Sequence, residues 1–301
     1  MNTRPPFPTV IDSSMISTFR ACPWKAYLEY LEHWKPKPQS IHLYAGKCFA
    51  AGLEAARMAF YDGAESPEGA VAVGLEVLRR DWGDVVPPDG VAKTLDRMLG
   101  ALIFYFEHYP LGTDSAKPFK MGEKWTVEFS FAEPLGVEHP ETGEPLILAG
   151  RADQIVHYAG GTYIEDDKTA TSLGASWAKQ WDLRSQFTHY AWAAERMGIH
   201  VDGVLVRGVS ILKTKYDTQE SVTYRPAWQI ARGIAQLERD ILRMIEAWQS
   251  GAWDMNLDHA CADFGGCGYR QICLVQDTQP FLDAGFERRQ WNPVTREETV
   301  L

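Results

Sequence analysis

The chain has 301 residues, of which 45% are hydrophobic, and it carries a formal net charge of −10. This composition is typical of a folded protein and excludes an intrinsically disordered chain. The acidic balance argues against a protein that coats nucleic acid over its whole surface, although a local basic cleft is still compatible with it. No apolar run reaches the roughly 18 residues of a membrane span, and the N-terminal residues lack the apolar core of a signal peptide. We therefore expect a cytoplasmic protein with no membrane partner.

The first half of the chain has a helical pattern, with apolar residues recurring at spacings of three and four. The stretches with this pattern are residues 13–34, 45–63, 66–82 and 91–110. Residues 45–110 are therefore expected to form a helical portion ahead of a sheet.

The pattern changes to strands in the middle of the chain. Two β-rich runs within residues 146–170 flank Gly160 and Gly161, which predicts a β-hairpin. Further elements are expected as a helix over 176–198, strands over 203–215 and 219–226, and a helix over 226–250. This order predicts an α/β fold with a mixed central β-sheet flanked by helices.

The sequence YIEDDKTA, residues 163–170, is unusually acidic for a strand. Because side chains alternate across a strand, Asp166 and Lys168 share one face, and Glu165 and Asp167 share the other. The predicted hairpin brings Asp153 beside Asp166, so two carboxylates and one ammonium converge. Such a group could hold Mg²⁺, which would activate a water molecule that Lys168 orients. The alternative is an exposed hairpin whose acids are solvated.

Three further residues bear on this choice. Glu128 lies on the polar face of the alternating stretch around 125–131 and could supply a third carboxylate. Gln186 and Tyr190 are four residues apart in the following helix, so both project from one face of it. The first turns of that helix are expected to form a wall of the same cleft.

Three short motifs, GRAD (150–153), DDKT (166–169) and QFTHY (186–190), occur in an order and at intervals that resemble the PD-(D/E)XK nuclease superfamily, in its RecB-like exonuclease branch. This resemblance implies a restriction-endonuclease-like core and metal-dependent hydrolysis of DNA with Mg²⁺ or Mn²⁺. It also implies a place in DNA repair or recombination. The roles it implies are metal ligands for Asp153 and Asp166, the catalytic lysine for Lys168, an auxiliary acid for Glu128, and contacts with DNA or the active-site strand for Gln186 and Tyr190.

One position departs from the family pattern. Members of this branch carry a histidine ligand on an early helix, in the pattern G-x-x-x-H-x-x-L-E, and the comparable stretch GKCFAAGLE has Ala50 at that place. Either one metal ligand is missing or another residue replaces it. Glu54, one turn further along, and His42, just before the stretch, are the two replacements considered, and Glu54 is taken as the third metal ligand.

The cysteines form a second pattern. Cys261, Cys267 and Cys273 lie close together near the C-terminus, and Cys22 precedes a proline far away in the sequence. Four soft thiolates suit zinc or an iron–sulfur cluster. The pattern resembles the iron–sulfur branch of the same superfamily, which includes CRISPR-adaptation nucleases, although the first of the C-terminal gaps is longer here. That resemblance implies a [4Fe–4S] cluster that staples the C-terminal segment, residues 257–276, to the first helix, with zinc as the alternative. Cys48 falls outside the pattern and is expected in the core.

Aromatic and basic residues offer weaker signals for DNA binding. Trp177 and Trp181, one turn apart, are the best candidates for stacking on bases. Basic residues expected near the cleft are Lys179, Arg184, Arg207, Lys213 and Lys215.

Together these patterns predict one nuclease domain over residues 11–276 and a C-terminal tail over 277–301. The predicted function is metal-dependent hydrolysis of DNA, as an exonuclease on single-stranded or end-containing substrate. The first alternative is a catalytically reduced DNA-binding or partner-binding module that keeps the fold and the cluster. The second is a structural protein stapled by zinc.

Overall fold

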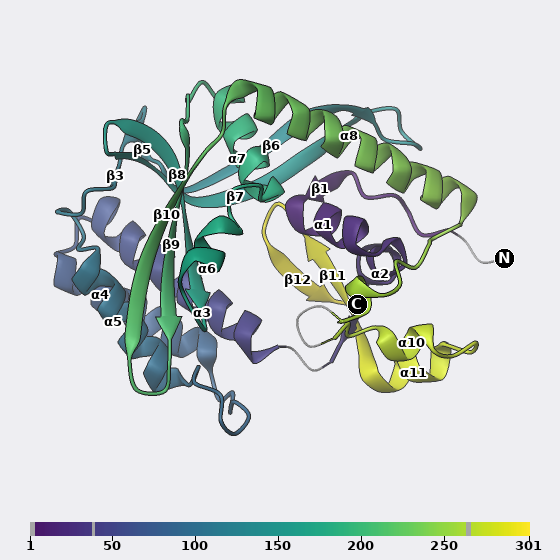
Figure 1. Cartoon of the computed structure of the whole chain (residues 1–301), viewed down its shortest axis with the longest axis horizontal. Helices are drawn as coiled ribbons and strands as arrows, with labels where there is room; N and C mark the ends of the chain where they lie inside the picture. The colour runs from purple at the N-terminus through teal and green to yellow at the C-terminus, as the bar shows by residue number, and fades with distance from the viewer. Residues whose placement is uncertain (1–3, 38–39, 263–265) are drawn as a thin grey trace. The chain divides into compact units, whose positions relative to one another are not determined.

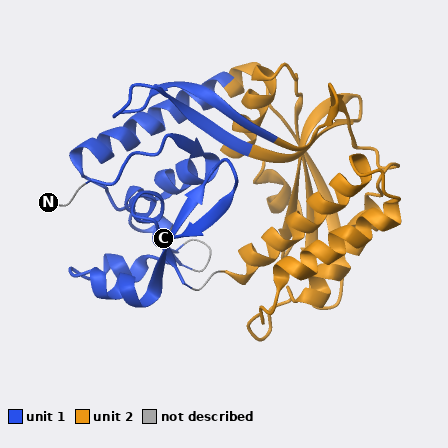
Figure 2. Ribbon diagram, turned by 180° about the vertical axis from the view of Figure 1, so that it is seen from behind, with its two compact units in different colours: residues 1–38, 130–150, 231–301 blue, residues 39–129, 151–230 orange. Residues whose placement is uncertain are grey.

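The computed structural model describes residues 4–37, 40–262 and 266–301 (Figure 1). The chain divides into two compact units (Figure 2). One contains residues 1–38, 130–150 and 231–301, and the other contains residues 39–129 and 151–230. Within the described part of the chain, no helix is long and apolar enough to cross a membrane.

The second unit carries most of the central sheet and a layer of helices. Its helices are α3 (Ile41–Tyr61), α4 (Pro67–Trp82), α5 (Leu95–His108), α6 (Ala175–Lys179) and α7 (Ser185–Arg196). Its strands are β3 (Lys117–Pro118), β4 (Lys120–Met121), β5 (Lys124–Trp125), the start of β6 (Val127–Glu138), most of β7 (Pro145–Tyr158), β8 (Gly161–Ala170), β9 (Gly203–Ile211) and β10 (Tyr216–Tyr224).

The first unit contains both ends of the chain. Its elements are β1 (Val10–Asp12), α1 (Ser13–Ala21), α2 (Pro23–Ala26), the π-helix η1 (Tyr27–Leu31), β2 (Trp34–Pro36), most of α8 (Ala227–Ser250), α9 (His259–Ala262), α10 (Arg270–Cys273), α11 (Gln279–Gly285), β11 (Phe286–Asn292) and β12 (Glu297–Val300). The residues expected as a C-terminal tail thus form a helix and a hairpin, and β11 pairs with β2.

The central sheet is mixed, as predicted. Its strand order is β1-β7-β8-β9-β10, and β3 and β6 also pair with β7. β8 is antiparallel to β7 and parallel to β9, whereas β10 is antiparallel to β9. All nine residues of β9 are buried, which explains its nearly continuous apolar sequence.

The predicted hairpin joins β7 to β8 through a two-residue turn. Tyr158 pairs with Gly161, and the turn residues Ala159 and Gly160 have φ angles of +48° and +84°. Two consecutive positive φ values are the mark of a type I′ turn, whose twist matches that of the paired strands. Gly160 adopts this conformation without steric cost.

Helices α3, α4 and α5 (Figure 1) form the helical portion predicted for residues 45–110. Their buried side chains form an apolar core. α3 and α4 approach closely at Gly52 and Gly74, because glycine has no Cβ atom. A Cβ atom on Gly74 would lie 2.5 Å from the Gly52 carbonyl oxygen. α3 also packs on β8, and α5 packs on β9 and β10. The acidic strand is therefore covered by a helix.

Candidate active site

Asp153, Asp166 and Lys168 come together where β7 and β8 separate. The pairing of the two strands runs from Tyr158 and Gly161 as far as Gln154 and Glu165. Just beyond it, Asp153 Oδ2 accepts a hydrogen bond from the backbone N–H of Asp167 at 2.7 Å. The carboxylate of Asp166 forms an ion pair with Lys168 Nζ. The predicted convergence of two carboxylates and one ammonium is therefore present.

The charges in this group act strongly on one another. Burial raises the pKa of Asp153 to about 7, and the negative charges of Asp166 and Asp167 add to the effect. For Lys168, burial lowers the pKa, but the charges of Asp166 and Asp153 outweigh it, so the pKa is raised overall and the side chain stays an ammonium. The Lys168 side chain is 33% exposed, whereas that of Asp166 is 3% exposed. The ammonium can thus meet a ligand from solvent while it holds the buried acid.

Glu128 and Glu54 are joined by an arginine, Arg151. Arg151 Nε is 3.0 Å from Glu128 Oε2, and Arg151 Nη1 is 3.2 Å from Glu54 Oε1. Burial raises the pKa of Glu128 to about 8, with further contributions from the charges of Asp153 and Glu54. Glu128 also has a φ angle of +53°, an uncommon conformation for a residue with a side chain. Such conformations cost free energy and often occur at functional sites.

The predicted ligand set of Asp153, Asp166 and Glu54 is not gathered around one point. Among the residues that the structure describes, no group of three or more His, Cys, Asp or Glu side chains is arranged to hold a metal ion. Two of these acids pair with cations of the protein instead, Asp166 with Lys168 and Glu54 with Arg151. Asp153 and Asp166 still form a carboxylate pair, and Mg²⁺ is commonly held by one or two carboxylates together with water and phosphate oxygens.

The place of the family histidine is exposed. Ala50 lies on α3, and Glu54 one turn later contacts the arginine of the site. His42 lies exposed in the first turn of the same helix, two turns before Ala50. Of the two candidate replacements, Glu54 and His42, Glu54 lies near the acids of the site, because its charge helps to raise the pKa of Glu128.

Gln186 and Tyr190 lie on one face of α7, as predicted, and Gln186 Nε2 donates a hydrogen bond to Tyr190 Oη at 2.7 Å. α7 packs against β8, the strand that carries Asp166. The bond fixes the amide and the phenol as one unit beside that strand.

The expectation that Trp177 and Trp181 stack on bases is wrong. Each is 7% exposed, and their rings pack edge to face with centroids 5.6 Å apart. Trp177 lies directly on β9, where a Cβ atom on Gly208 would be 2.3 Å from its ring. Arg207 is not a surface cation either, because it is 1% exposed and pairs with Asp114 and Glu220. Both tryptophans and this arginine belong to the core.

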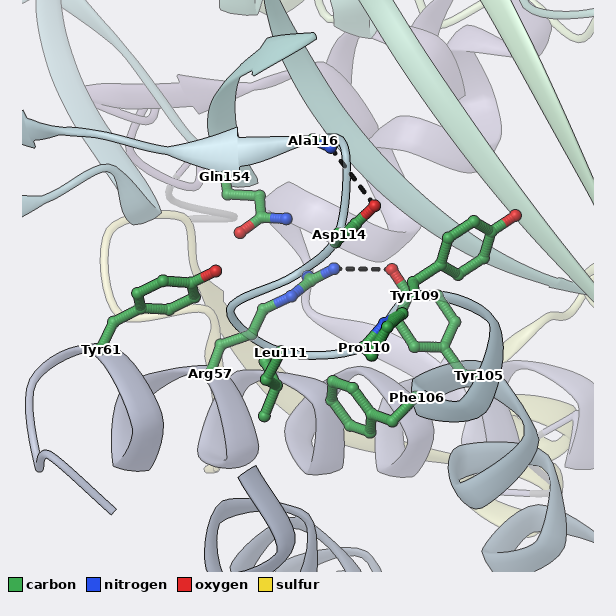
Figure 3. A pocket seen from close by; sticks show the side chains of 10 residues that line it. All are labelled: Arg57, Tyr61, Tyr105, Phe106, Tyr109, Pro110, Leu111, Asp114, Ala116 and Gln154. Carbon is green, nitrogen blue, oxygen red and sulfur yellow. Dashed lines mark hydrogen bonds between the residues drawn. The ribbon is translucent and has the colours of Figure 1, made fainter. Parts of the chain in front are cut away.

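The face of β8 that carries Glu165 and Asp167 holds a feature that the sequence analysis missed. These acids are buried, and Arg57 of α3 pairs with both, at 2.8 Å from Glu165 Oε1 and 2.7 Å from Asp167 Oδ2. The guanidinium also donates a hydrogen bond to Tyr105 Oη, beside a cavity of about 10 Å³ lined by Gln154 and Tyr61 among others (Figure 3). The sequence signal was an arginine three residues after Glu54, within the apolar helix that covers the sheet.

The four cysteines of the second pattern all belong to the first unit. Cys22 lies between α1 and α2, Cys261 in α9, Cys267 just before α10, and Cys273 at the end of α10. Burial raises the pKa of the Cys273 thiol, and the charges of Cys22, Cys267 and Cys261 raise it further. Cys48 instead is buried in α3, in the apolar core of the second unit.

The comparisons with known proteins agree with the fold. The description of the PD-(D/E)XK nuclease superfamily matches residues 13–274, so the chain belongs to this superfamily. No curated protein matches the sequence.

Two solved structures are similar to this one. A candidate exonuclease from Eubacterium rectale has a TM-score of 0.51 and 13% sequence identity, over 84% of this chain and 87% of that one. The structure of SSO0001 has a TM-score of 0.30 and 15% identity, over 74% of this chain and 84% of that one. At this identity the first structure supports the fold alone.

Proposed function

We propose that the protein is a metal-dependent deoxyribonuclease that removes nucleotides from the ends of DNA. The observation that carries this proposal is the group of Asp153, Asp166 and Lys168 at the point where β7 and β8 separate, in a chain of the PD-(D/E)XK superfamily. Residues 11–276 are proposed to form the nuclease domain.

In this proposal Asp153 and Asp166 would hold Mg²⁺ or Mn²⁺, which supplies an activated water and charge stabilisation when bound. The carboxylate pair fits a hard divalent ion, because the charge of Asp166 helps to raise the pKa of Asp153 and a cation would relieve that repulsion. Lys168, partly exposed, would orient the water or stabilise charge on the phosphate. Glu128 and Glu54 are proposed as auxiliary acids, and Gln186 and Tyr190 as contacts to DNA or to β8.

The test is a cleavage assay on DNA labelled at one end, single-stranded and double-stranded, with Mg²⁺, Mn²⁺ or EDTA. We expect loss of label as mononucleotides with either metal and no loss in EDTA. Release of internal fragments instead would replace the exonuclease assignment with an endonuclease. Circular DNA serves as the matched control, because an exonuclease needs an end.

A second candidate function is a DNA-binding or partner-binding module with reduced catalysis. The observation that favours it is the lack of a three-ligand metal group in the described residues, together with Ala50 at the place of the family histidine. Retention of labelled DNA without cleavage, under every metal condition, would favour this candidate.

We also propose that Cys22, Cys261, Cys267 and Cys273 bind a [4Fe–4S] cluster. The support is that the charges of the other three thiols act on Cys273, so four soft donors lie within electrostatic reach of one another. Among the described residues, no three of these thiols are arranged to bind a metal ion, so binding of the cluster would have to bring them together. Iron and sulfide analysis with absorbance near 400 nm tests the cluster, and zinc in place of iron would overturn it.

A further inference from the structure

Two acids of β8 point away from the proposed metal site and are fully enclosed. The side chains of Glu165 and Asp167 are 0% and 2% exposed. Two buried carboxylates on one strand face are costly unless cations and hydrogen bonds compensate them. The cation that reaches both of them is Arg57, which is itself 3% exposed.

The geometry of Arg57 links α3 to β8 at two places. One terminal nitrogen pairs with Glu165 and the other with Asp167, two residues apart on the same strand face. Tyr105 of α5 adds to the clamp, because it accepts from Arg57 Nη2 at 2.8 Å and donates to Asp167 Oδ1 at 2.8 Å. A planar guanidinium can bridge two acids in this way, whereas the single ammonium of a lysine offers no such fork.

This clamp lies directly behind the proposed metal ligands. Asp166 stands between the two clamped acids in the sequence, and the backbone N–H of Asp167 donates to Asp153 Oδ2 at 2.7 Å. Fixing Asp167 therefore fixes the donor that orients Asp153, and fixing both flanking residues fixes the backbone of Asp166. In the described contacts Arg57 makes no hydrogen bond to Asp153 or Asp166. Its partners on β8 are Glu165 and Asp167, so it would act on the proposed ligands through that strand.

We propose that Arg57 is a positioning residue, which holds β8 through Glu165 and Asp167 so that Asp153 and Asp166 are set for a divalent cation. The inference deepens the proposed function and rests on it. Residues that orient metal ligands typically change metal affinity by about 10- to 100-fold when they are replaced.

The test measures Mn²⁺ binding to the full chain by calorimetry, at one pH and at a temperature where each variant is folded by circular dichroism. We expect Arg57→Met to bind Mn²⁺ about 10- to 100-fold more weakly than the native chain. Arg57→Lys keeps the charge but not the fork, so its affinity should lie between the two. Arg225→Met is the matched control, because Arg225 is also buried at 2% exposure but contacts Trp181 and Tyr224 rather than β8.

A double-mutant cycle makes the test specific. If Arg57 acts through Asp167, the variant Arg57→Met with Asp167→Asn should bind Mn²⁺ no more weakly than Arg57→Met alone. Independent, multiplying losses would overturn the proposal, and so would native affinity in folded Arg57→Met. If Arg57→Met does not fold, native affinity in both Arg57→Lys and Asp167→Asn overturns it instead. A native chain that binds no Mn²⁺ and cleaves no DNA would remove the proposed function, and this inference with it.

Discussion

Asp153 carries a proton at a pH where an ordinary aspartate has lost it. Its pKa is raised from 3.8 to about 7, mainly by burial. Between these two values the folded chain binds more protons at this residue than the unfolded chain does. The contribution of Asp153 to the free energy of unfolding therefore falls as pH rises through this window. Glu128, whose pKa is raised to about 8, extends the same trend upward.

The raised pKa of Asp153 predicts a pH-dependent effect of removing its carboxylate. In EDTA, Asp153→Asn should raise the thermal unfolding midpoint relative to the native chain at pH 8, and should change it less at pH 5. The reason is that at pH 5 the native residue is already neutral. An equal effect of the substitution at both values would contradict the assigned shift.

The same residue predicts how metal stabilises the fold. Ligand carboxylates must lose their protons before they bind a cation. Excess Mn²⁺ should therefore raise the unfolding midpoint of the native chain more at pH 8 than at pH 5.5. In Asp153→Asn the Mn²⁺ effect should shrink at both values. A metal effect of the same size in this variant would rule out Asp153 as a ligand.

At the scale of the element, the β7–β8 hairpin aligns the strands that carry the site. Ala159 occupies a left-handed conformation with φ of +48°, which alanine adopts at a cost. Asn-Gly is the favoured pair for a type I′ turn. Ala159→Asn should therefore stabilise the chain by roughly 0.5 kcal/mol, measured by denaturant unfolding. Gly160→Val is the opposing control, because a β-branched residue at φ of +84° should destabilise the fold.

The hairpin also shows what the sequence could establish at this scale. Alternation placed Asp166 and Lys168 on one face and Glu165 and Asp167 on the other, and the contacts confirm that division. The sequence could not show what covers the second face, because the partner Arg57 is more than a hundred residues away in the chain. Asp167 lies on the face opposite Asp166, yet its side chain is buried and its backbone N–H donates to Asp153. Long-range ion pairs of this kind leave no periodic signal in a sequence.

The prediction that Trp177 and Trp181 stack on bases was wrong for a related reason. Their spacing predicted one face of a continuous helix, but α6 ends at Lys179 and Trp181 lies in the turn that follows it. Spacing also does not say whether a face of a helix meets solvent or the sheet. A glycine in the neighbouring strand, Gly208, makes room for Trp177 and turns that face inward. Such complementarity between a large and a small residue depends on the strand register, which the sequence alone did not provide.

At the scale of the whole molecule, the periodicity of the sequence predicted the mixed sheet and the helical portion. The three short motifs predicted the superfamily, and the family match confirms it. The division of the chain into two units, with β6, β7 and α8 each contributing to both, was not predicted. Long strands and a long helix that pass from one unit to the other have the same local pattern as those that stay within one.

The proposed cluster makes a prediction at this scale. Alanine at Cys22, Cys261, Cys267 or Cys273 should each lower the iron content and the soluble yield, because metal binding contributes to folding free energy. Cys48→Ala is the matched control and should keep the iron, at a packing cost of about 1 kcal/mol. Iron retained in full by Cys22→Ala would separate this residue from the other three.

The central claim is that the carboxylates at the separation of β7 and β8 hydrolyse DNA with a bound metal. The most direct measurement compares the native chain with Asp166→Ala on end-labelled DNA in Mg²⁺ and in Mn²⁺, with DNA retention measured in parallel. The account predicts a loss of cleavage of at least about 100-fold in the variant, with folding and DNA retention kept. Undiminished cleavage by Asp166→Ala would contradict it.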